Sequence, residues 1–175
     1  MVDLIIIAMM ASLGIAIKVI IVPLAAIITG PLFIPGGVIA GGFYMLFLVL
    51  GVSLTKKRGT ATLIALVQAM IVTTTGTLGS HGAASLLTYT LPGLAVDLLF
   101  LILRRHKACC APCCFAAGVI ANMAGSYAVN LAVFNLSLIP MLLSLCAAAL
   151  SGGLGGLVAY AVSAKIQKLG ILNQE

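Results

Sequence analysis

The sequence predicts an all-α integral membrane protein, with six transmembrane helices in a single domain over residues 1–175. Of its residues, 63% are hydrophobic and 7% are charged, whereas about one quarter of a soluble globular protein is charged. The length of 175 residues leaves room for about six spans of ~20 residues with short connections. Most Lys and Arg residues fall in three clusters, and such clusters are typical of the cytoplasmic loops of membrane proteins.

The basic clusters and the glycine- and proline-rich breaks divide the chain into its spans. The predicted spans cover residues 4–22, 38–54, 60–78, 83–103, 108–131 and 139–164, and they place both termini in the cytoplasm. The net charge of +6 does not indicate nucleic-acid binding, because no polar face exists to carry the cations. The clusters are Lys56, Lys57 and Arg58; Arg104, Arg105 and Lys107; and Lys165 and Lys168.

Two features distinguish the beginning of the chain. Residues 23–37 are apolar but contain three prolines and three glycines, which predicts a broken or re-entrant segment and an end of the first span before Pro23. Within the first span, Ala8, Ser12 and Ala16 recur at every fourth position and would let another helix approach closely. That helix could belong to this chain or to a partner subunit.

Polar side chains gather in the outer third of the predicted membrane region, whereas the inner two thirds are almost entirely apolar. The rise per residue places them about 20 Å from the cytoplasmic ends of their spans or in the outer loop. The spacing of Asn122, Ser126 and Asn130 puts all three on one helix face. This layer favours a solute pocket open to the outside over scattered interhelical hydrogen bonds. The candidate substrate-binding residues are Lys18, Thr73, Thr74, His81, Tyr89, Asn122, Ser126 and Asn130.

Asp97 is the one acidic residue in the interior of the chain. By the same estimate it lies about 12 Å deeper than Lys18, so the two cannot pair. Arg104 follows seven residues later on nearly the same helix face, and its long side chain can reach back toward the carboxylate. We therefore expect Asp97 and Arg104 to form a structural or subunit-coupling ion pair.

The cysteine-rich sequence CCAPCC comprises Cys109, Cys110, Cys113 and Cys114. A C-x-x-C pair can be a redox site or part of a metal site. The predicted topology places it in the cytoplasm, where disulfides rarely persist, and no second cluster completes a metal-ligand set. Packing of small apolar thiols, or their acylation, is the favoured interpretation. A membrane thiol-redox protein that uses Cys110 and Cys113 is the less favoured rival.

The sequence does not predict an enzyme. It contains no Ser-His-Asp set at matching depth, no paired carboxylates, no acidic metal-binding cluster and no nucleotide-binding motif. We accordingly expect no metal and no cofactor. Active transport would need a second protein to supply the energy.

The chain resembles the substrate-binding S components of energy-coupling-factor (ECF) vitamin transporters. The resemblance rests on the six short helices, the small residues of the first span, the broken segment and the polar outer layer. Residues 30–59, the GSHG loop at residues 79–82 and PGLAVDLLF at residues 92–100 look most like the YkoE type, which is associated with thiamine or its hydroxymethylpyrimidine precursor.

The resemblance implies a multi-pass protein of the prokaryotic plasma membrane that works with a T subunit and two cytoplasmic ATPases. A small vitamin-like solute would be captured from outside, and the face of Ala8, Ser12 and Ala16 would meet the T subunit. In one respect the chain departs from the YkoE type: it lacks that type's glutamates near the third helix, and Lys18 disfavours a cationic ligand. The main alternative is a non-transporting subunit that assembles membrane complexes through its glycine-rich faces.

Overall fold

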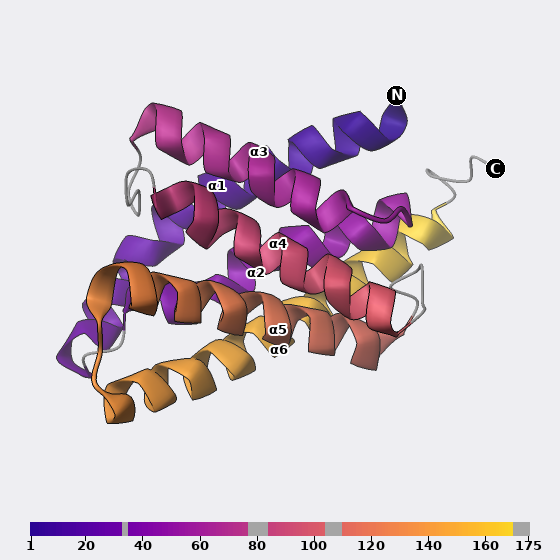
Figure 1. The fold of residues 1–175 in the computed structure, drawn as a ribbon. Helices are drawn as coiled ribbons and strands as arrows, with labels where there is room; N and C mark the ends of the chain where they lie inside the picture. The colour runs from indigo at the N-terminus through magenta and orange to yellow at the C-terminus, as the bar shows by residue number, and fades with distance from the viewer. Residues whose placement is uncertain (33–34, 77–83, 104–109, 170–175) are drawn as a thin grey trace.

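A computed structural model describes residues 1–32, 35–76, 84–103 and 110–169 of the chain. These residues form six α-helices, a short 3₁₀ turn at Gly30–Leu32 and a π-helical turn at Asn130–Phe134, and no strand occurs among them (Figure 1). The helices are α1 Val2–Thr29, α2 Gly36–Thr55, α3 Thr60–Thr75, α4 Ala84–Ile102, α5 Ala111–Val129 and α6 Leu138–Lys168.

The helices confirm a multi-pass membrane protein. Five of them are long and apolar enough to cross a bilayer, and α3 is apolar but has 16 residues. At 1.5 Å per residue α3 is about 24 Å long, which is somewhat less than a typical hydrocarbon core. Successive helices run in opposite directions, so that both ends of the chain lie at the same end of the bundle (Figure 1). A cytoplasmic location for that end stays a prediction from the basic clusters.

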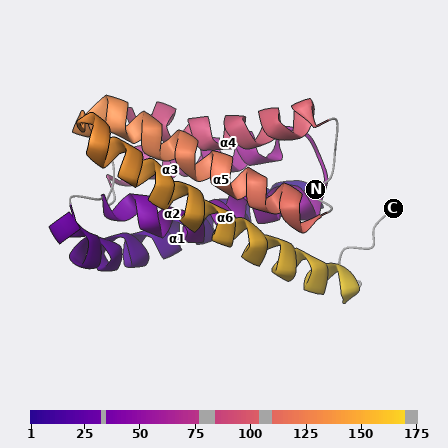
Figure 2. The ribbon, with the colours of Figure 1, turned by 90° about the horizontal axis from the view of Figure 1, so that it is seen from below.

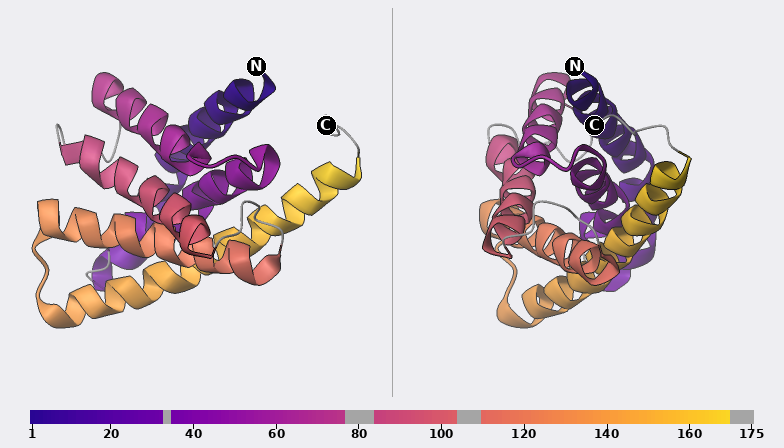
Figure 3. Two further views of the ribbon diagram at one scale, coloured as in Figure 1. Left: turned by 45° about the vertical axis from the view of Figure 1, so that its right-hand side comes forward. Right: turned by 90° about the vertical axis from the view of Figure 1, so that its right-hand side faces the viewer.

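Helix α2 occupies the centre of the bundle and contacts each of the other five helices. In its membrane-length stretch 67% of the residues are buried, whereas the other four candidate spans are 28–33% buried. Helix α6 packs on both α2 and α5, and its C-terminal part extends beyond them (Figures 2 and 3). Since most of α2 is buried against other helices and the rest faces lipid, its sequence is apolar on every face instead of amphipathic.

The densest part of the core lies in the half of the bundle that contains the chain ends. Leu48 and Val49 of α2 are fully buried there against Ile64 of α3, Val96 of α4 and Ala117 of α5, together with Ile7 and Met10 of α1. Helix pairs approach closely where glycines face each other. A Cβ on Gly118 would meet the backbone of Gly152, and one on Gly155 would meet the backbone of Gly42. These contacts fix how α2, α5 and α6 cross.

The prediction that the first helix ends before Pro23 is wrong, because α1 continues through Pro23 to Thr29. Proline removes one backbone hydrogen bond but leaves the later ones intact, and neighbouring helices in a membrane protein tolerate that loss. The first part of the predicted re-entrant segment is therefore helical, and Gly30–Leu32 forms a single 3₁₀ turn. Residues 33–34 lie outside the described part of the chain.

Candidate solute-binding site

A cavity of about 50 Å³ lies between the five helices α1 to α5. Each of α1 to α4 contributes at least one polar side chain, and α5 contributes part of the apolar wall. The polar lining consists of Lys18 from α1, Tyr44 from α2, Gln68 from α3, and Thr88 and Tyr89 from α4. The apolar lining is Met45, Leu48, Pro92, Gly125 and Val129.

Lys18 brings a positive charge to this cavity and is held there by two aromatic rings. Its Nζ lies 3.9 Å from the centre of the Tyr89 ring and 5.4 Å from that of Tyr44. An ammonium group over an aromatic face is stabilised by the negative charge density of the ring, and more so where water is excluded. The two tyrosines thereby offset part of the cost of placing a cation at membrane depth.

Gln68 places an unused hydrogen-bond donor at the same site. The residue is 4% exposed, and its Nε2 has no partner among the described residues. The amide packs against Gly14, where a Cβ would collide with Nε2, so that the glycine makes room for it. A buried polar group without a partner costs about 1–3 kcal/mol. A bound solute that offers an acceptor would recover this energy.

The remaining polar groups of the cavity are oriented by backbone contacts. The Tyr44 hydroxyl donates to Gly37 O at 2.8 Å, which fixes its ring against the first turn of α2. The Thr88 hydroxyl is buried and donates weakly to Ser85 O at 3.4 Å. Among the residues that the structure describes, none that lines this cavity carries a carboxylate, thiol or imidazole. The site therefore offers hydrogen-bond donors, two aromatic rings and one positive charge.

The structure brings together Lys18 and Tyr89 among the predicted site residues. Thr73 and Thr74 lie at the exposed C-terminal end of α3, and their hydroxyls donate to Ala69 O at 2.7 Å and Met70 O at 2.8 Å within the same helix. His81 lies outside the described residues.

The three predicted residues of α5 have separate surroundings. Asn122 is 1% exposed, and its Nδ2 donates to Val38 O of α2 and Ala148 O of α6. Asn130 is buried at the end of α5, where its Oδ1 accepts a hydrogen bond from Leu136 N at 2.8 Å. Ser126 is half-buried. None of the three is among the residues that line the cavity.

Asp97 interacts with the beginning of α3. Its Oδ2 accepts hydrogen bonds from Thr62 N at 2.8 Å and from Thr62 Oγ1 at 2.6 Å. The carboxylate thus satisfies a first-turn amide of another helix, where negative charge is also favoured by the helix dipole. Arg104 lies outside the described residues, so that the ion pair with Asp97 stays a prediction.

The first-helix residues assigned to subunit coupling lie on the surface of the chain. Ala8, Ser12 and Ala16 are all exposed, and the Ser12 hydroxyl donates to Ala8 O within α1. Ile7, Ala11 and Ile15, on the neighbouring face about 100° around the helix, are buried. This face therefore does not pack against the chain's own helices. A contact with a partner subunit is the other interpretation that the sequence left open.

The cysteines differ from expectation. Cys110 and Cys113 form a disulfide at the start of α5, with Cα atoms 5.3 Å apart. The expectation that both pack as free thiols is wrong for this pair, because the first turn of a helix brings the two Cα atoms within disulfide range. Cys114 is buried in the core, and Cys109 lies outside the described residues.

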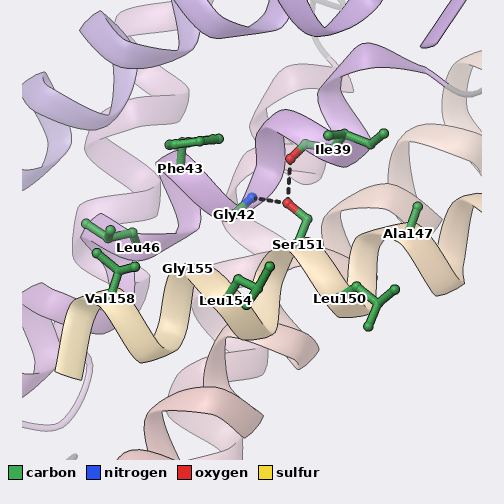
Figure 4. A pocket seen from close by; sticks show the side chains of 10 residues that line it. All are labelled: Ile39, Gly42, Phe43, Leu46, Ala147, Leu150, Ser151, Leu154, Gly155 and Val158. Atoms are coloured by element: carbon green, nitrogen blue, oxygen red, sulfur yellow. Dashed lines mark hydrogen bonds between the residues drawn. The ribbon is translucent and has the colours of Figure 1, made fainter. Parts of the chain in front are cut away.

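A larger groove of about 450 Å³ lies between α2 and α6 (Figure 4). Its wall is apolar except for Ser151, whose hydroxyl accepts from Gly42 N at 2.9 Å and donates to Ile39 O. Since its one polar side chain is already occupied, this groove offers no group to orient a polar solute. We therefore assign solute binding to the smaller cavity around Lys18.

Sequence reasoning did not place Tyr44 and Gln68 in the site. Gln68 is the sole amide side chain within an otherwise apolar and threonine-containing helix, and an isolated amide at membrane depth is a recognisable signal. Tyr44 lies in an apolar run in which nothing marks its direction.

The bundle encloses a small, partly polar cavity between its helices, and its volume of about 50 Å³ is well below the ~300 Å³ at which pockets for organic ligands begin. Residues 2–124, well over half of the chain, match the family described as "ABC-type cobalt transport system, permease component". The chain belongs to this family. No curated protein sequence is significantly similar to it.

A solved structure described as "Crystal structure of an S-component of ECF transporter" superimposes with a TM-score of 0.77 at 20% sequence identity. The match covers 98% of this chain and 87% of that one. The chain therefore has the fold of an ECF S component, and the resemblance noted in the sequence is confirmed at the level of the fold.

Proposed function

We propose that this protein is the substrate-capturing S component of an ECF-type importer. The observation that carries the proposal is the cavity around Lys18, with the unpartnered Gln68 amide, inside an S-component fold. The family match to a transport permease supports the same class of protein. A transport subunit without its own ATPase also agrees with a sequence that lacks a nucleotide-binding motif.

In this proposal a solute enters the cavity from the outer side of the membrane. Gln68 Nε2 and the Lys18 ammonium group donate to its acceptor atoms, while the rings of Tyr44 and Tyr89 contact its flat surface. Release toward the cytoplasm depends on a T subunit and two ATPases. The exposed face of Ala8, Ser12 and Ala16 is the surface we assign to the T subunit, because small residues allow close helix contact.

The lining of the cavity indicates which solutes fit. Cobalt and similar divalent ions bind imidazole, thiolate or carboxylate ligands, and the described lining contains none of these. A positively charged thiamine would face Lys18 without a compensating carboxylate. We propose a small, flat, neutral or anionic organic solute that is rich in acceptors, of which a hydroxymethylpyrimidine-like precursor is one example. The cavity of about 50 Å³ must widen to admit it, by movement of the helices or side chains that line it.

Native mass spectrometry of the mildly purified protein tests this proposal, with the bound small molecules released and identified. We expect close to one equivalent of a neutral or anionic organic compound. The Gln68→Leu and Lys18→Met variants should retain several-fold less of it, because each removes a donor worth about 1 kcal/mol or more. Thr90→Val is the matched control, since its hydroxyl bonds to its own helix at Leu86 O.

Two results would contradict the proposal. One is a protein that purifies without a small molecule and shows no thermal shift with a panel of vitamins and their precursors. The other is equal retention of the compound by the Gln68→Leu variant and the Thr90→Val control. Recovery of a divalent metal at one equivalent would reject the organic solute but keep the transport class.

The glycine-rich faces do not favour the assembly-subunit alternative. Gly42, Gly118, Gly152 and Gly155 all meet backbone atoms of this same chain. These faces are already used within the bundle and are not available to a partner helix.

A further inference from the structure

A second pocket lies at the end of the bundle that carries the chain termini, and the proposed transport role does not use it. It has a volume of about 340 Å³ and lies between the α2–α3 turn and the C-terminal half of α4. Lys57, Arg58 and Gly59 form its polar side, while leucines of α4 and the buried Phe100 form its apolar side.

The polar side of the pocket is basic. Lys56, Lys57 and Arg58 follow one another in the turn, and the side chain of Lys57 is 67% exposed. One donor of Lys57 is used by Asp3 at 2.5 Å, but an ammonium group has three. The charge of Asp97, which also lines the pocket, is directed into the first turn of α3 through its two hydrogen bonds with Thr62.

The apolar side continues as a stripe along α4. Leu94, Leu98 and Leu101 line the pocket and are 51%, 55% and 53% exposed. Leu87 and Leu91 extend the same helix face toward the other end of the bundle and are also exposed. From Leu87 to Leu101 the stripe is about 21 Å long, which is more than the ~15 Å of hydrocarbon in one leaflet.

We propose that this pocket binds one anionic phospholipid of the cytoplasmic leaflet, with its phosphate between Lys57 and Arg58 and an acyl chain along the leucine stripe of α4. Basic pockets at the cytoplasmic ends of transmembrane helices favour such headgroups over neutral ones. The basic side of the pocket lies at the end of the bundle and the leucine stripe runs from it toward the membrane centre. A phospholipid has the same arrangement, with a charged headgroup at the surface and an acyl chain that points inward. A soluble phosphate would use only the basic side.

Native mass spectrometry of the purified full chain can test the site, after incubation with phosphatidylglycerol or phosphatidylcholine of identical acyl chains. We expect one retained phosphatidylglycerol and much less phosphatidylcholine. Arg58→Gln should lower the retained phosphatidylglycerol about fivefold, because one basic residue near an anionic lipid contributes on this order. Leu98→Gln should lower the retention of phosphatidylglycerol through the apolar side. Melting temperatures of all variants show whether they remain folded.

The matched control is the double variant Lys165→Gln and Lys168→Gln, which removes two cations from the last turn of α6, away from this pocket. It should retain phosphatidylglycerol like the wild type. An equal loss in the control and in Arg58→Gln would overturn the site in favour of general surface charge. Equal retention of the two lipids would overturn it, because the basic side would then not select an anionic headgroup. Competition by chain-free glycerophosphoglycerol at the same concentration would also overturn it.

Discussion

Asn122 connects three helices through a single side chain. Its Nδ2 lies 3.0 Å from Val38 O on α2 and 2.9 Å from Ala148 O on α6, while its own backbone belongs to α5. Its Oδ1 has no hydrogen-bond partner among the described residues. An amide that donates both protons to other helices has a structural role, whatever further contact it makes with a solute.

Replacement of Asn122 by Leu should therefore destabilise the bundle. The change removes two buried hydrogen bonds and leaves two carbonyl groups with one partner fewer, which should cost about 1–3 kcal/mol. The melting temperature of the detergent-purified protein should fall, whereas Tyr127→Phe on an exposed part of the same helix should leave it unchanged. If Asn122→Leu lost bound solute at an unchanged melting temperature, a direct role in binding would replace the structural one.

At the level of helices, glycines determine how closely α5 and α6 approach. Gly118 and Gly152 are reciprocal partners, because a Cβ on either one would collide with the carbonyl of the other. Gly156 lies one turn further along α6 and meets the backbone of Cys114 in the same way. The crossing therefore depends on a row of positions without side chains, and not on matched large residues.

Gly118→Leu should separate α5 from α6 and weaken the fold severely. The leucine would meet backbone atoms that cannot move aside, so that we expect loss of the monodisperse protein in size-exclusion chromatography. Gly30→Ala is the control, because a Cβ there meets nothing within 4 Å. A monodisperse and thermally stable Gly118→Leu protein would show that the crossing tolerates a wider separation.

At the level of the whole molecule, α1 presents two different faces. Ile7, Met10, Ala11 and Ile15 are buried in this chain, whereas the small residues Ala8, Ser12 and Ala16 face outward. Solute binding and partner contact are thus assigned to different parts of one helix, with Lys18 beyond the exposed small-residue face.

Ala8→Trp should consequently separate transport from binding. The bulky ring would prevent close approach of a T subunit, so uptake by the assembled transporter should be lost, while solute retention in detergent stays near the wild-type level. Leu13→Trp changes an exposed position of α1 outside this face and should preserve uptake. Parallel loss of uptake and retention in Ala8→Trp would contradict the assignment.

The helices and the depth of the site could be predicted from the sequence, because basic clusters and apolar runs show where each span begins and ends. Basic residues end α2 and occupy the last turn of α6, and the common depth of Lys18 and Tyr89, which meet in the structure, follows from the rise of their helices. The continuation of α1 through Pro23 could not be predicted, since a proline breaks or bends a helix depending on its neighbours.

The direction in which a side chain points was harder to predict from the sequence than its depth in the membrane. Because α2 is apolar all round its axis, no apolar stripe indicates that Tyr44 points at Lys18. Likewise, Asn122 and Asn130 share a face of α5 with Ser126, yet tertiary contacts give the two amides different partners. Which of several polar residues at one depth face the same cavity depends on helix rotation, which a uniformly apolar sequence does not specify.

The unequal lengths of the helices have a consequence for the surrounding lipid. Helix α3 has 16 residues and α6 has 31, so their lengths are about 24 Å and 46 Å. A hydrocarbon layer of ~30 Å cannot match both sides of such a protein when it stands upright. The last turn of α6, with Lys165 and Lys168, can extend into the headgroup region, whereas the bilayer has to thin beside α3. Thinning on one side stores elastic strain in the membrane, and the thickness of the lipid layer thereby influences how the protein is oriented in it.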